Sequence, residues 1–199
     1  MACNLKNVLS SANNCLENPA GVANYVMIVP LTNDYITSIG IHDGANQYVI
    51  TPKTGTALKG FRIDFKSQTG QVTAEDNGPG KAWTVTGTGR VENNEDDMAY
   101  VSRVLSNLDG KFLAFFPTGN LTPEGTEWKV VGNPFGDNEF TVSADSGAAR
   151  GDDHGLTYNI ACNYQVYPTI KWYGTIEKED DPSSSALSDS SADNIIITG

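Results

Sequence analysis

The chain has few of the residues on which catalysis and metal binding usually depend. Of its 199 residues only two are His and three are Cys, and it contains no GxSxG nucleophile motif, Walker-type phosphate loop or GxGxxG fingerprint. These absences leave a Ser-His-Asp triad and a nucleotide-binding enzyme without sequence support. Gly87-Thr88-Gly89 is too short to form a phosphate loop. We therefore expect no enzymatic activity, no catalytic, cofactor-binding or metal-binding residues, and no cofactor.

Paired cysteines, a leader peptide and a membrane span are also missing from the pattern. Cys3, Cys15 and Cys162 form no CxxC pair. An odd count without a basic and apolar leader indicates reduced thiols in a cytosol-like compartment. No apolar run approaches the roughly 20 residues that cross a bilayer. The sequence therefore predicts a protein that is neither secreted by the usual route nor embedded in a membrane.

Basic residues are scarce as well. Thirteen Lys and Arg stand against 24 Asp and Glu, which gives a net charge of -11. A free-standing nucleic-acid-binding protein needs the opposite sign, because its affinity comes largely from neutralising phosphates. An acidic surface instead keeps a protein soluble and repels DNA.

What the chain does contain is a succession of short β-strands separated by turns. Its length predicts one domain with room for a sizeable core, and 20 Gly and 9 Pro punctuate the strands. Alternating or continuous apolar residues predict strands at Tyr25–Leu31, Tyr35–Ile41, Tyr48–Ile50, Phe112–Phe116, Trp128–Val131, Phe140–Ala144, Leu156–Ile160 and Ile170–Ile176. We expect Pro117 to Gly125 to form a turn-rich loop.

One helix is expected in the middle of the chain. Asn93 or Asn94 supplies the N-cap, and the acidic residues 95–97 lie in the first turn, where the helix dipole favours negative charge. The apolar stripe of this helix consists of Met98, Val101, Leu105 and Leu108. A weaker periodicity indicates a short N-terminal helix through Leu5, Val8, Leu9, Ala12 and Leu16.

Two long hairpins are predicted, at about 61–86 and 139–162. In each, an apolar strand is followed by a Gly-containing and acidic turn and then by an aromatic-led strand. The matching positions are Ile63, Phe65, Gly70, Asp76, Gly78, Trp83 and Val85 in the first, and Phe140, Val142, Gly147, Asp153, Gly155, Tyr158 and Ile160 in the second. We interpret this likeness as a degenerate repeat that places two comparable hairpins in one domain.

The composition changes abruptly after residue 176. A charged run, 177–181, leads into a Ser/Asp-rich segment, 182–193, and the triplet Ile195–Ile197. We therefore predict a domain at 1–176, including an N-terminal arm, and an acidic, Ser-rich C-terminal arm at 177–199. The Ile triplet is expected to add as a strand to an exposed sheet edge, with a neighbouring subunit as its holder.

The remaining candidate sites are better explained without chemistry. Asp152-Asp153-His154 and His42-Asp43-Gly44 offer metal ligands, but contiguous residues rarely converge on one ion, and turns are favoured. Helix-start electrostatics accounts for the carboxylates at 95–97. Trp83, Trp128 and Trp172 offer stacking surfaces for sugars, although their alternation with aliphatic residues favours a core or interface role. The glycosylation pattern at 120–122 has no meaning without secretion.

Several of these segments together resemble a known family of structural proteins. In Cys15–Ile39, a Cys and a small Gly-containing turn precede an apolar strand and an Asp-aromatic turn. The likeness continues through the helix 94–108, the strand 111–116, V-V-G-N at 130–133, S-A-D-S-G at 143–147, D-D-H-G-L-T-Y-N-I at 152–160 and Tyr167-Pro168. This pattern over residues 15–176 resembles the major tail tube proteins of tailed bacteriophages, in particular Bacteroidetes-type phages and prophages. The Ser/Asp-rich C-terminal arm and a less Gly-rich N-terminal turn depart from it.

The resemblance implies a fold and an assembly. The fold is mainly β (α+β), a β-sandwich or partial barrel with one flanking helix, long hairpins and extended terminal arms. The family implies hexameric rings that stack into a tube whose lumen is a continuous β-barrel, with DNA passing through without specific binding. The net charge of -11 then predicts that the groups facing this lumen are net acidic. Identical subunits and other tail or head proteins are then the partners. A capsid decoration protein or head–tail connector and a carbohydrate-binding β-sandwich remain as alternatives.

Overall fold

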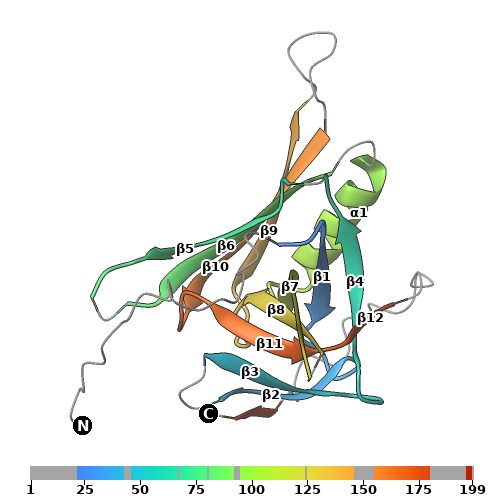
Figure 1. Cartoon of the computed structure of the whole chain (residues 1–199). Helices are drawn as coiled ribbons and strands as arrows, with labels where there is room; N and C mark the ends of the chain where they lie inside the picture. Colours follow the sequence, from blue (N-terminus) through green and yellow to red (C-terminus); the bar gives the residue numbers. More distant parts are fainter. Residues whose placement is uncertain are drawn as a thin grey trace.

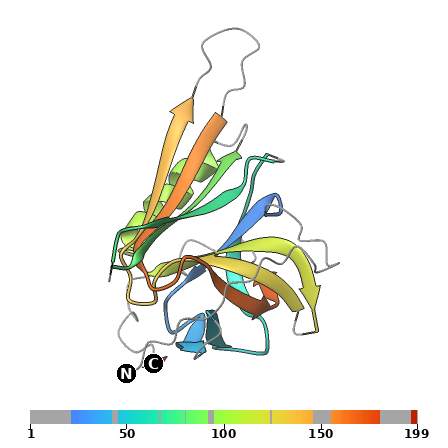
Figure 2. The same cartoon turned by 60° about the vertical axis from the view of Figure 1, so that its left-hand side comes forward.

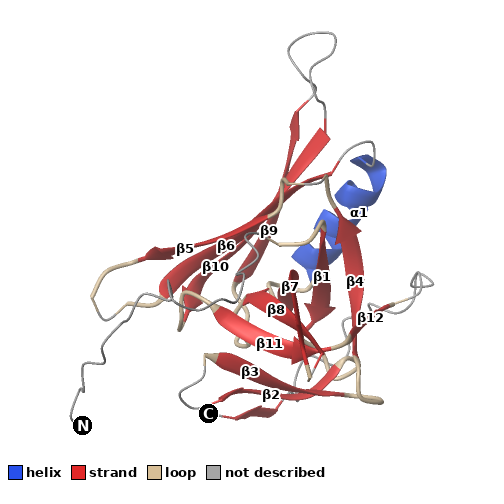
Figure 3. Cartoon of the chain, in the orientation of Figure 1, coloured by secondary structure: helices blue, strands red, loops and turns tan. Residues whose placement is uncertain are grey.

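Over the residues that it describes, the computed structural model is mainly β, as the sequence predicts, with one helix (Figure 3). It describes residues 22–42, 46–66, 68–79, 81–91, 95–123, 125–145, 155–179 and 196–198. The elements are β1 (Tyr25–Pro30), β2 (Ile36–His42), β3 (Gln47–Pro52), β4 (Leu58–Asp64), β5 (Gln71–Asp76), β6 (Trp83–Val91), α1 (Glu95–Asn107), β7 (Phe112–Thr122), β8 (Gly125–Val131), β9 (Asn138–Asp145), β10 (Gly155–Gln165), β11 (Ile170–Gly174), β12 (Ile176–Lys178) and β13 (Ile196–Thr198).

Two sheets form the fold. One has nine strands in the order β12-β4-β1-β7-β8-β11-β3-β2-β13, and the other has four in the order β5-β6-β10-β9. In Figures 1 and 2 the four-stranded sheet crosses one side of the larger sheet, and the end of its β9–β10 hairpin extends beyond the body.

A first hydrophobic core fills the space between the two sheets. From the larger sheet it takes alternate residues of β1, such as Val26 and Ile28, and from the smaller sheet the buried Tyr158 and Ile160. The helix α1 adds Leu105, which is 4% exposed. Strands buried on both faces carry continuous apolar runs, and β1 and β7 were recognisable in the sequence for that reason.

A second core lies on the opposite face of the larger sheet. The intervening residues of β1, Met27 and Val29, face it together with Phe115, Trp128 and residues of β2, β3 and β4. Tyr35 and Phe61, from opposite parts of the strand order, bring their ring centroids to 6.1 Å. The nine-stranded sheet therefore bends around this core. This curvature corresponds to the partial barrel in the predicted fold class.

The predicted hairpin at 61–86 is wrong. The strand with Ile63 is β4, which pairs with β1 in the larger sheet, whereas β6 pairs with β5 and β10. The second hairpin, 139–162, is confirmed as β9–β10. The proposed repeat does not hold in the topology, because its two first strands lie in different sheets. Strand β5 gave little apolar signal because all its residues but Val72 are exposed.

Two other boundaries differ from the sequence predictions. The segment expected to be a loop after Pro117 continues as β7 to Thr122, with a break in the β7–β8 register between Pro117 and Leu121. The single strand expected at 170–176 is divided into β11 and β12, and Gly174, the last residue of β11, adopts φ +153°.

The C-terminal arm begins within a strand. Residues 176–178 form β12, which pairs in parallel with β4, so the expected boundary after residue 176 falls inside the larger sheet. The Ile-rich end does form a strand, β13, which pairs in parallel with β2 of the same chain. A neighbouring subunit as the holder of the arm stays a prediction. Residues 180–195 and the predicted N-terminal helix lie outside the described residues.

Candidate assembly surface

The outer face of the four-stranded sheet carries mostly polar side chains, many of them Thr. Directly opposed residues of an antiparallel sheet share a face, and the register places one alternate set of residues away from the first core. This set is Gln71, Thr73 and Glu75 on β5, Thr84, Thr86, Thr88 and Arg90 on β6, Thr157, Asn159 and Ala161 on β10, and Glu139, Thr141 and Ser143 on β9. Hydroxyl and amide groups dominate this surface, which we call the threonine face.

The inner face of the same sheet explains the glycines of β6. A Cβ on Gly87 would lie 2.4 Å from the Phe116 ring, and one on Gly89 would lie 2.3 Å from the Tyr158 hydroxyl. These two positions are therefore left without side chains so that aromatic rings of the core can lie against the strand. The Gly-Thr-Gly sequence has this packing role and the intervening Thr88 belongs to the threonine face.

The edges of this sheet, β5 and β9, have no further strand beside them within the described ranges. Backbone contacts show which groups point outward. On β6, Arg90 accepts a hydrogen bond from Lys66 N–H (2.7 Å) and donates one to Thr69 Oγ1 (3.1 Å), so its backbone faces the β5 side. Backbone direction alternates along a strand. Gln71, Thr73 and Glu75 consequently bond β6, and the backbone groups of Val72 and Ala74 point to the open edge.

The same alternation can be followed to the other edge. The N–H of Asn138 points away from β10, to Gly110 O at 3.4 Å. The backbone groups of Phe140, Val142 and Ala144 therefore also point outward. At both edges, the residues with outward backbone groups are those whose side chains belong to the inner face.

This symmetry has a geometric consequence. In a sheet with an even number of antiparallel strands, the two edge strands run in opposite directions and expose the backbone groups of the same side-chain face. If β9 of one copy were placed beside β5 of another, the pairing would be antiparallel and the threonine faces of both copies would continue each other. With an odd number of strands, the two edge strands would run in the same direction, and their outward backbone groups would belong to opposite side-chain faces.

The charge on the threonine face is lower than the composition suggests. Of the positions named above, Glu75 and Glu139 are acidic and Arg90 is basic, and the register places one more acidic residue, Asp145 opposite Gly155, on the same set of positions. The threonine face is therefore rich in neutral hydroxyl groups, with a small excess of acidic residues. Asp152, Asp153 and His154, which follow β9 in the chain, lie outside the described residues, as do Asp43 and Gly44.

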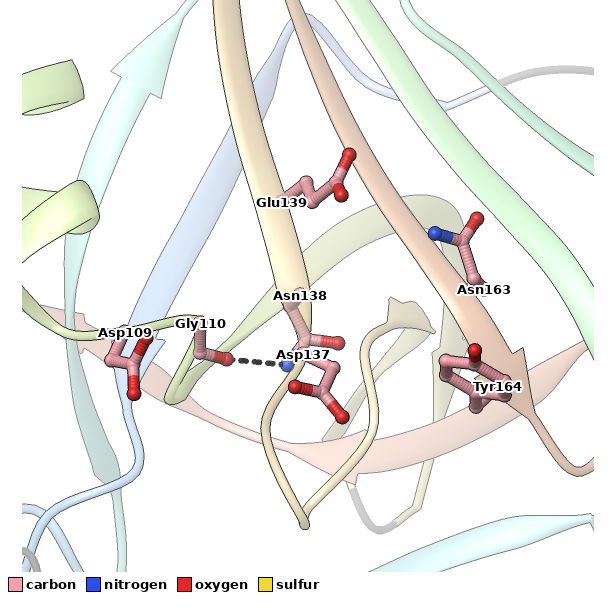
Figure 4. A pocket seen from close by; sticks show the side chains of 7 residues that line it. All are labelled: Asp109, Gly110, Asp137, Asn138, Glu139, Asn163 and Tyr164. Carbon is pink, nitrogen blue, oxygen red and sulfur yellow. Dashed lines mark hydrogen bonds between the residues drawn. The ribbon is translucent and has the colours of Figure 1, made fainter.

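An open acidic pocket of about 460 Å³ lies at one end of the sheet. Figure 4 shows Asp109, Asp137 and Glu139 around it, with Asn163 and Tyr164 on the facing strand. Asp109 and Asp137 adopt φ +50° and φ +62°, values that Asp tolerates better than most residues. Among the described residues, no group of three potential ligands is arranged to hold a metal ion.

A second polar cluster lies on the larger sheet. Glu127, which is 7% exposed, accepts hydrogen bonds from Lys171 Nζ (3.1 Å) and the Tyr173 hydroxyl (3.3 Å) on one carboxylate oxygen. Its other oxygen accepts from Thr118 and Asn120. Burial alone would raise the pKa of Glu127, but the hydrogen bond and charge of Lys171, with the bonds from Asn120 and Thr118, lower it. This cluster is satisfied and holds β7, β8 and β11 together.

The other candidate residues have structural roles. Trp128 and Trp172 are 3% and 6% exposed in the second core, and Trp83 is half-buried against the first, so the sugar-stacking alternative loses its platform. Cys162 is a buried free thiol whose pKa is raised by burial. In the described part of the chain, no helix has the length and apolar character needed to cross a membrane.

Two elements of this surface were missed by sequence reasoning. Strand β5 does alternate, with Val72 and Ala74 between Gln71, Thr73 and Glu75, and Asp76-Asn77-Gly78 marks a turn after it. That signal predicts the β5–β6 hairpin. Phe135, 73% exposed in the β8–β9 loop, had no signal, because exposure of one apolar residue leaves no periodic pattern.

Comparison of the chain with protein-family models, with curated protein sequences and with solved structures gives no match. The functional argument therefore depends on the geometry described above.

Proposed function

We propose that the protein is the protomer of a phage tail tube, which self-assembles by edge-to-edge pairing of its four-stranded sheet into rings that stack into a hollow conduit for DNA. The resemblance of residues 15–176 to tail tube proteins suggests this function. The protein acts mechanically and electrostatically in this proposal, without chemistry.

The observation that carries the proposal is the construction of the four-stranded sheet. It has an even number of antiparallel strands and two edges without a partner strand among the described residues. Natural proteins usually protect such edges, because unpaired N–H and C=O groups recruit other strands. A closed barrel made from several copies satisfies all of them at once. Each backbone hydrogen bond formed in this way contributes about 0.5–1.5 kcal/mol.

The threonine face would then line the lumen. DNA binds tightly to surfaces that neutralise its phosphates, and among the described side chains of this face Arg90 is the one cation, against Glu75 and Glu139. Short hydroxyl side chains leave the channel wide and contact water rather than the bases. A weakly anionic, hydroxyl-rich wall therefore allows a polyanion to slide without being held.

Assembly of the purified protein tests the proposal directly. Negative-stain electron microscopy should show rings or hollow tubes, with sedimentation well above that of a 21.3 kDa chain. A strictly monomeric protein at high concentration would refute it. Shell binding without self-assembly would instead indicate a capsid decoration protein.

A disulfide experiment tests the assigned edges. In a background with Cys3 and Cys15 replaced by Ser, the double variant Ala74→Cys/Ala144→Cys should form a ladder of covalent oligomers on oxidation, since opposed Cα atoms of paired strands lie within disulfide range. Each single variant is the matched control and should not extend beyond dimers. A double variant that gives no ladder although rings are visible would show that other edges meet.

A further inference from the structure

Strand β5 has little support of its own in the monomer. Within the described ranges it pairs with β6 alone. Val72 is the one residue of β5 that is not exposed, and it packs on the first core. A two-stranded ribbon without a core beneath it is only marginally stable in water. Because the proposed function pairs this strand with another copy, other contacts have to fix its geometry.

The contacts at the turn between β5 and β6 converge on the side chain of Asn77. Its Nδ2 donates to Ala82 O at 2.7 Å and to Asn163 O at 3.4 Å. Its Oδ1 accepts from Thr84 Oγ1 at 3.1 Å. The shorter backbone contact closes the hairpin, and the longer one reaches strand β10. We call these three hydrogen bonds the Asn77 clasp.

The bond to β10 is possible because β10 is irregular at this point. The β10–β6 register shifts between Cys162 and Gln165, which places an extra residue on β10. A β-bulge of this kind leaves backbone groups outside the regular ladder. Asn163, which Figure 4 shows on β10, lies within the bulge, and its carbonyl accepts the bond from Asn77. The clasp therefore ties the end of β5 to the strand two places away in the sheet order.

The beginning of β5 is held by a second set of contacts. Thr69 Oγ1 donates to Lys66 O at 2.7 Å and accepts from Arg90 N–H at 3.1 Å. The segment between these two fixed points, 71–76, is the whole of β5. Loss of either point would let the strand leave the geometry in which its outward N–H and C=O groups can pair.

We propose that Asn77 is a positioning residue for ring formation, and that its clasp holds β5 in the geometry that accepts β9 of a second copy. This inference rests on the proposed tube function and names a side chain on which the edge pairing depends. The apparent affinity of a partner falls in proportion to the fraction of molecules in the competent conformation. A strand that is competent about a tenth of the time therefore needs about ten times the concentration to form rings.

The first test removes the clasp and leaves the edge itself unchanged. Asn77→Ala should raise the concentration at which rings form about tenfold or more, measured by sedimentation velocity. Asn163→Ala is the matched control, because it removes an exposed Asn side chain and keeps the carbonyl that accepts the bond. It should form rings at the wild-type concentration. Hydrogen exchange at the amides of Thr73 and Glu75, which bond β6, should be faster in Asn77→Ala alone.

A disulfide tests whether fixing β5 is what Asn77 contributes. Glu75 and Thr84 are directly opposed on β5 and β6, which brings their Cα atoms within disulfide range. The variant Asn77→Ala/Glu75→Cys/Thr84→Cys is made in a background with Cys3 and Cys15 replaced by Ser. After oxidation it should form rings at the wild-type concentration. The same protein after reduction is the control and should need the higher concentration.

The outcomes separate this inference from the proposed function. Ring formation by Asn77→Ala at the wild-type concentration would overturn the inference, whatever its exchange rates. An oxidised triple variant that assembles no better than the reduced one would overturn it as well, because a fixed β5 would then not replace the clasp. A wild-type chain that forms no rings at any concentration would instead refute the proposed function.

Discussion

The two sheets of the molecule end in different ways. Both edges of the nine-stranded sheet carry a short parallel strand from the C-terminal part of the chain, β12 on β4 and β13 on β2. The edges of the four-stranded sheet, β5 and β9, have no such cover in the described residues. Under the proposed function, this difference separates a self-contained body, the nine-stranded sheet, from a sheet whose edges pair with other copies.

The faces of the sheets follow the same division. The central strands of the larger sheet are buried on both sides, between the first core and the second. The smaller sheet buries one side and presents the threonine face on the other. Folding stability should therefore depend on the larger sheet and the first core, and assembly on the smaller sheet. The predictions below test that separation.

The largest loss of stability is expected where the sheets meet. Phe116, fully buried, lies against Gly87 across the first core. Phe116→Ala should lower the free energy of unfolding by about 3–5 kcal/mol, because it removes the ring and leaves a cavity between the sheets. Chemical denaturation measures this change. Thr88→Ala, on the threonine face, is the control and should stay within about 0.5 kcal/mol; equal effects at both sites would contradict the division.

Proline at neighbouring positions of β5 should separate folding from assembly. Thr73→Pro removes an N–H that bonds β6 and should cost about 1–3 kcal/mol. Ala74→Pro removes an N–H that points to the open edge, so it should cost less in the monomer yet prevent ring formation. Both residues are exposed, so the two variants differ mainly in the direction of the N–H group that each one removes. Denaturation and sedimentation give the two readouts, and equal loss of stability would show that the outward backbone direction is assigned wrongly.

The sequence predicted elements whose pattern depends on burial. Continuous runs such as those containing Val26 and Phe115 revealed strands with two buried faces, and the stripe with Leu105 revealed α1. It failed where a strand has little buried surface. Strand β5 was missed because its contacts are mostly with solvent, and the strand with Ile63 was consequently given the wrong partner. Strand pairing over long sequence distances is not encoded in local periodicity.

The candidate surface was less predictable than the fold. The edges without a partner strand follow from the strand order, and the threonine face follows from the register. Amino-acid composition predicts neither the strand order nor the register. The net charge of -11 suggested an acidic lining, but a total charge does not say where charges lie. The Asn138 and Gln165 networks beside the β8–β9 loop connect residues far apart in the chain, up to 35 positions.

The Glu127 cluster should make the larger sheet sensitive to acid. Its pKa lies below the ordinary value of 4.5 in the folded protein, so its stabilising contribution is present above that pH and is lost as the pH falls through the lower, folded pKa. Glu127→Gln should lower the melting temperature at pH 7, and the difference from wild type should shrink toward pH 3. Glu139→Gln, on the exposed side of the smaller sheet, is the control and should change the melting temperature at pH 7 only slightly.

The smallest effect is expected at Tyr158, whose buried hydroxyl has no hydrogen-bond partner. Burial raises the pKa of Tyr158 and of Tyr48, so both are neutral in the physiological range. Tyr48, however, donates to Gly132 O at 2.9 Å. Tyr158→Phe should therefore be neutral or slightly stabilising, whereas Tyr48→Phe should cost about 1 kcal/mol, because it leaves a carbonyl without its donor. Equal losses in denaturation experiments would mean that the Tyr158 hydroxyl is also hydrogen-bonded in solution. The first core would then contain a satisfied tyrosine hydroxyl, as the second core does at Tyr48.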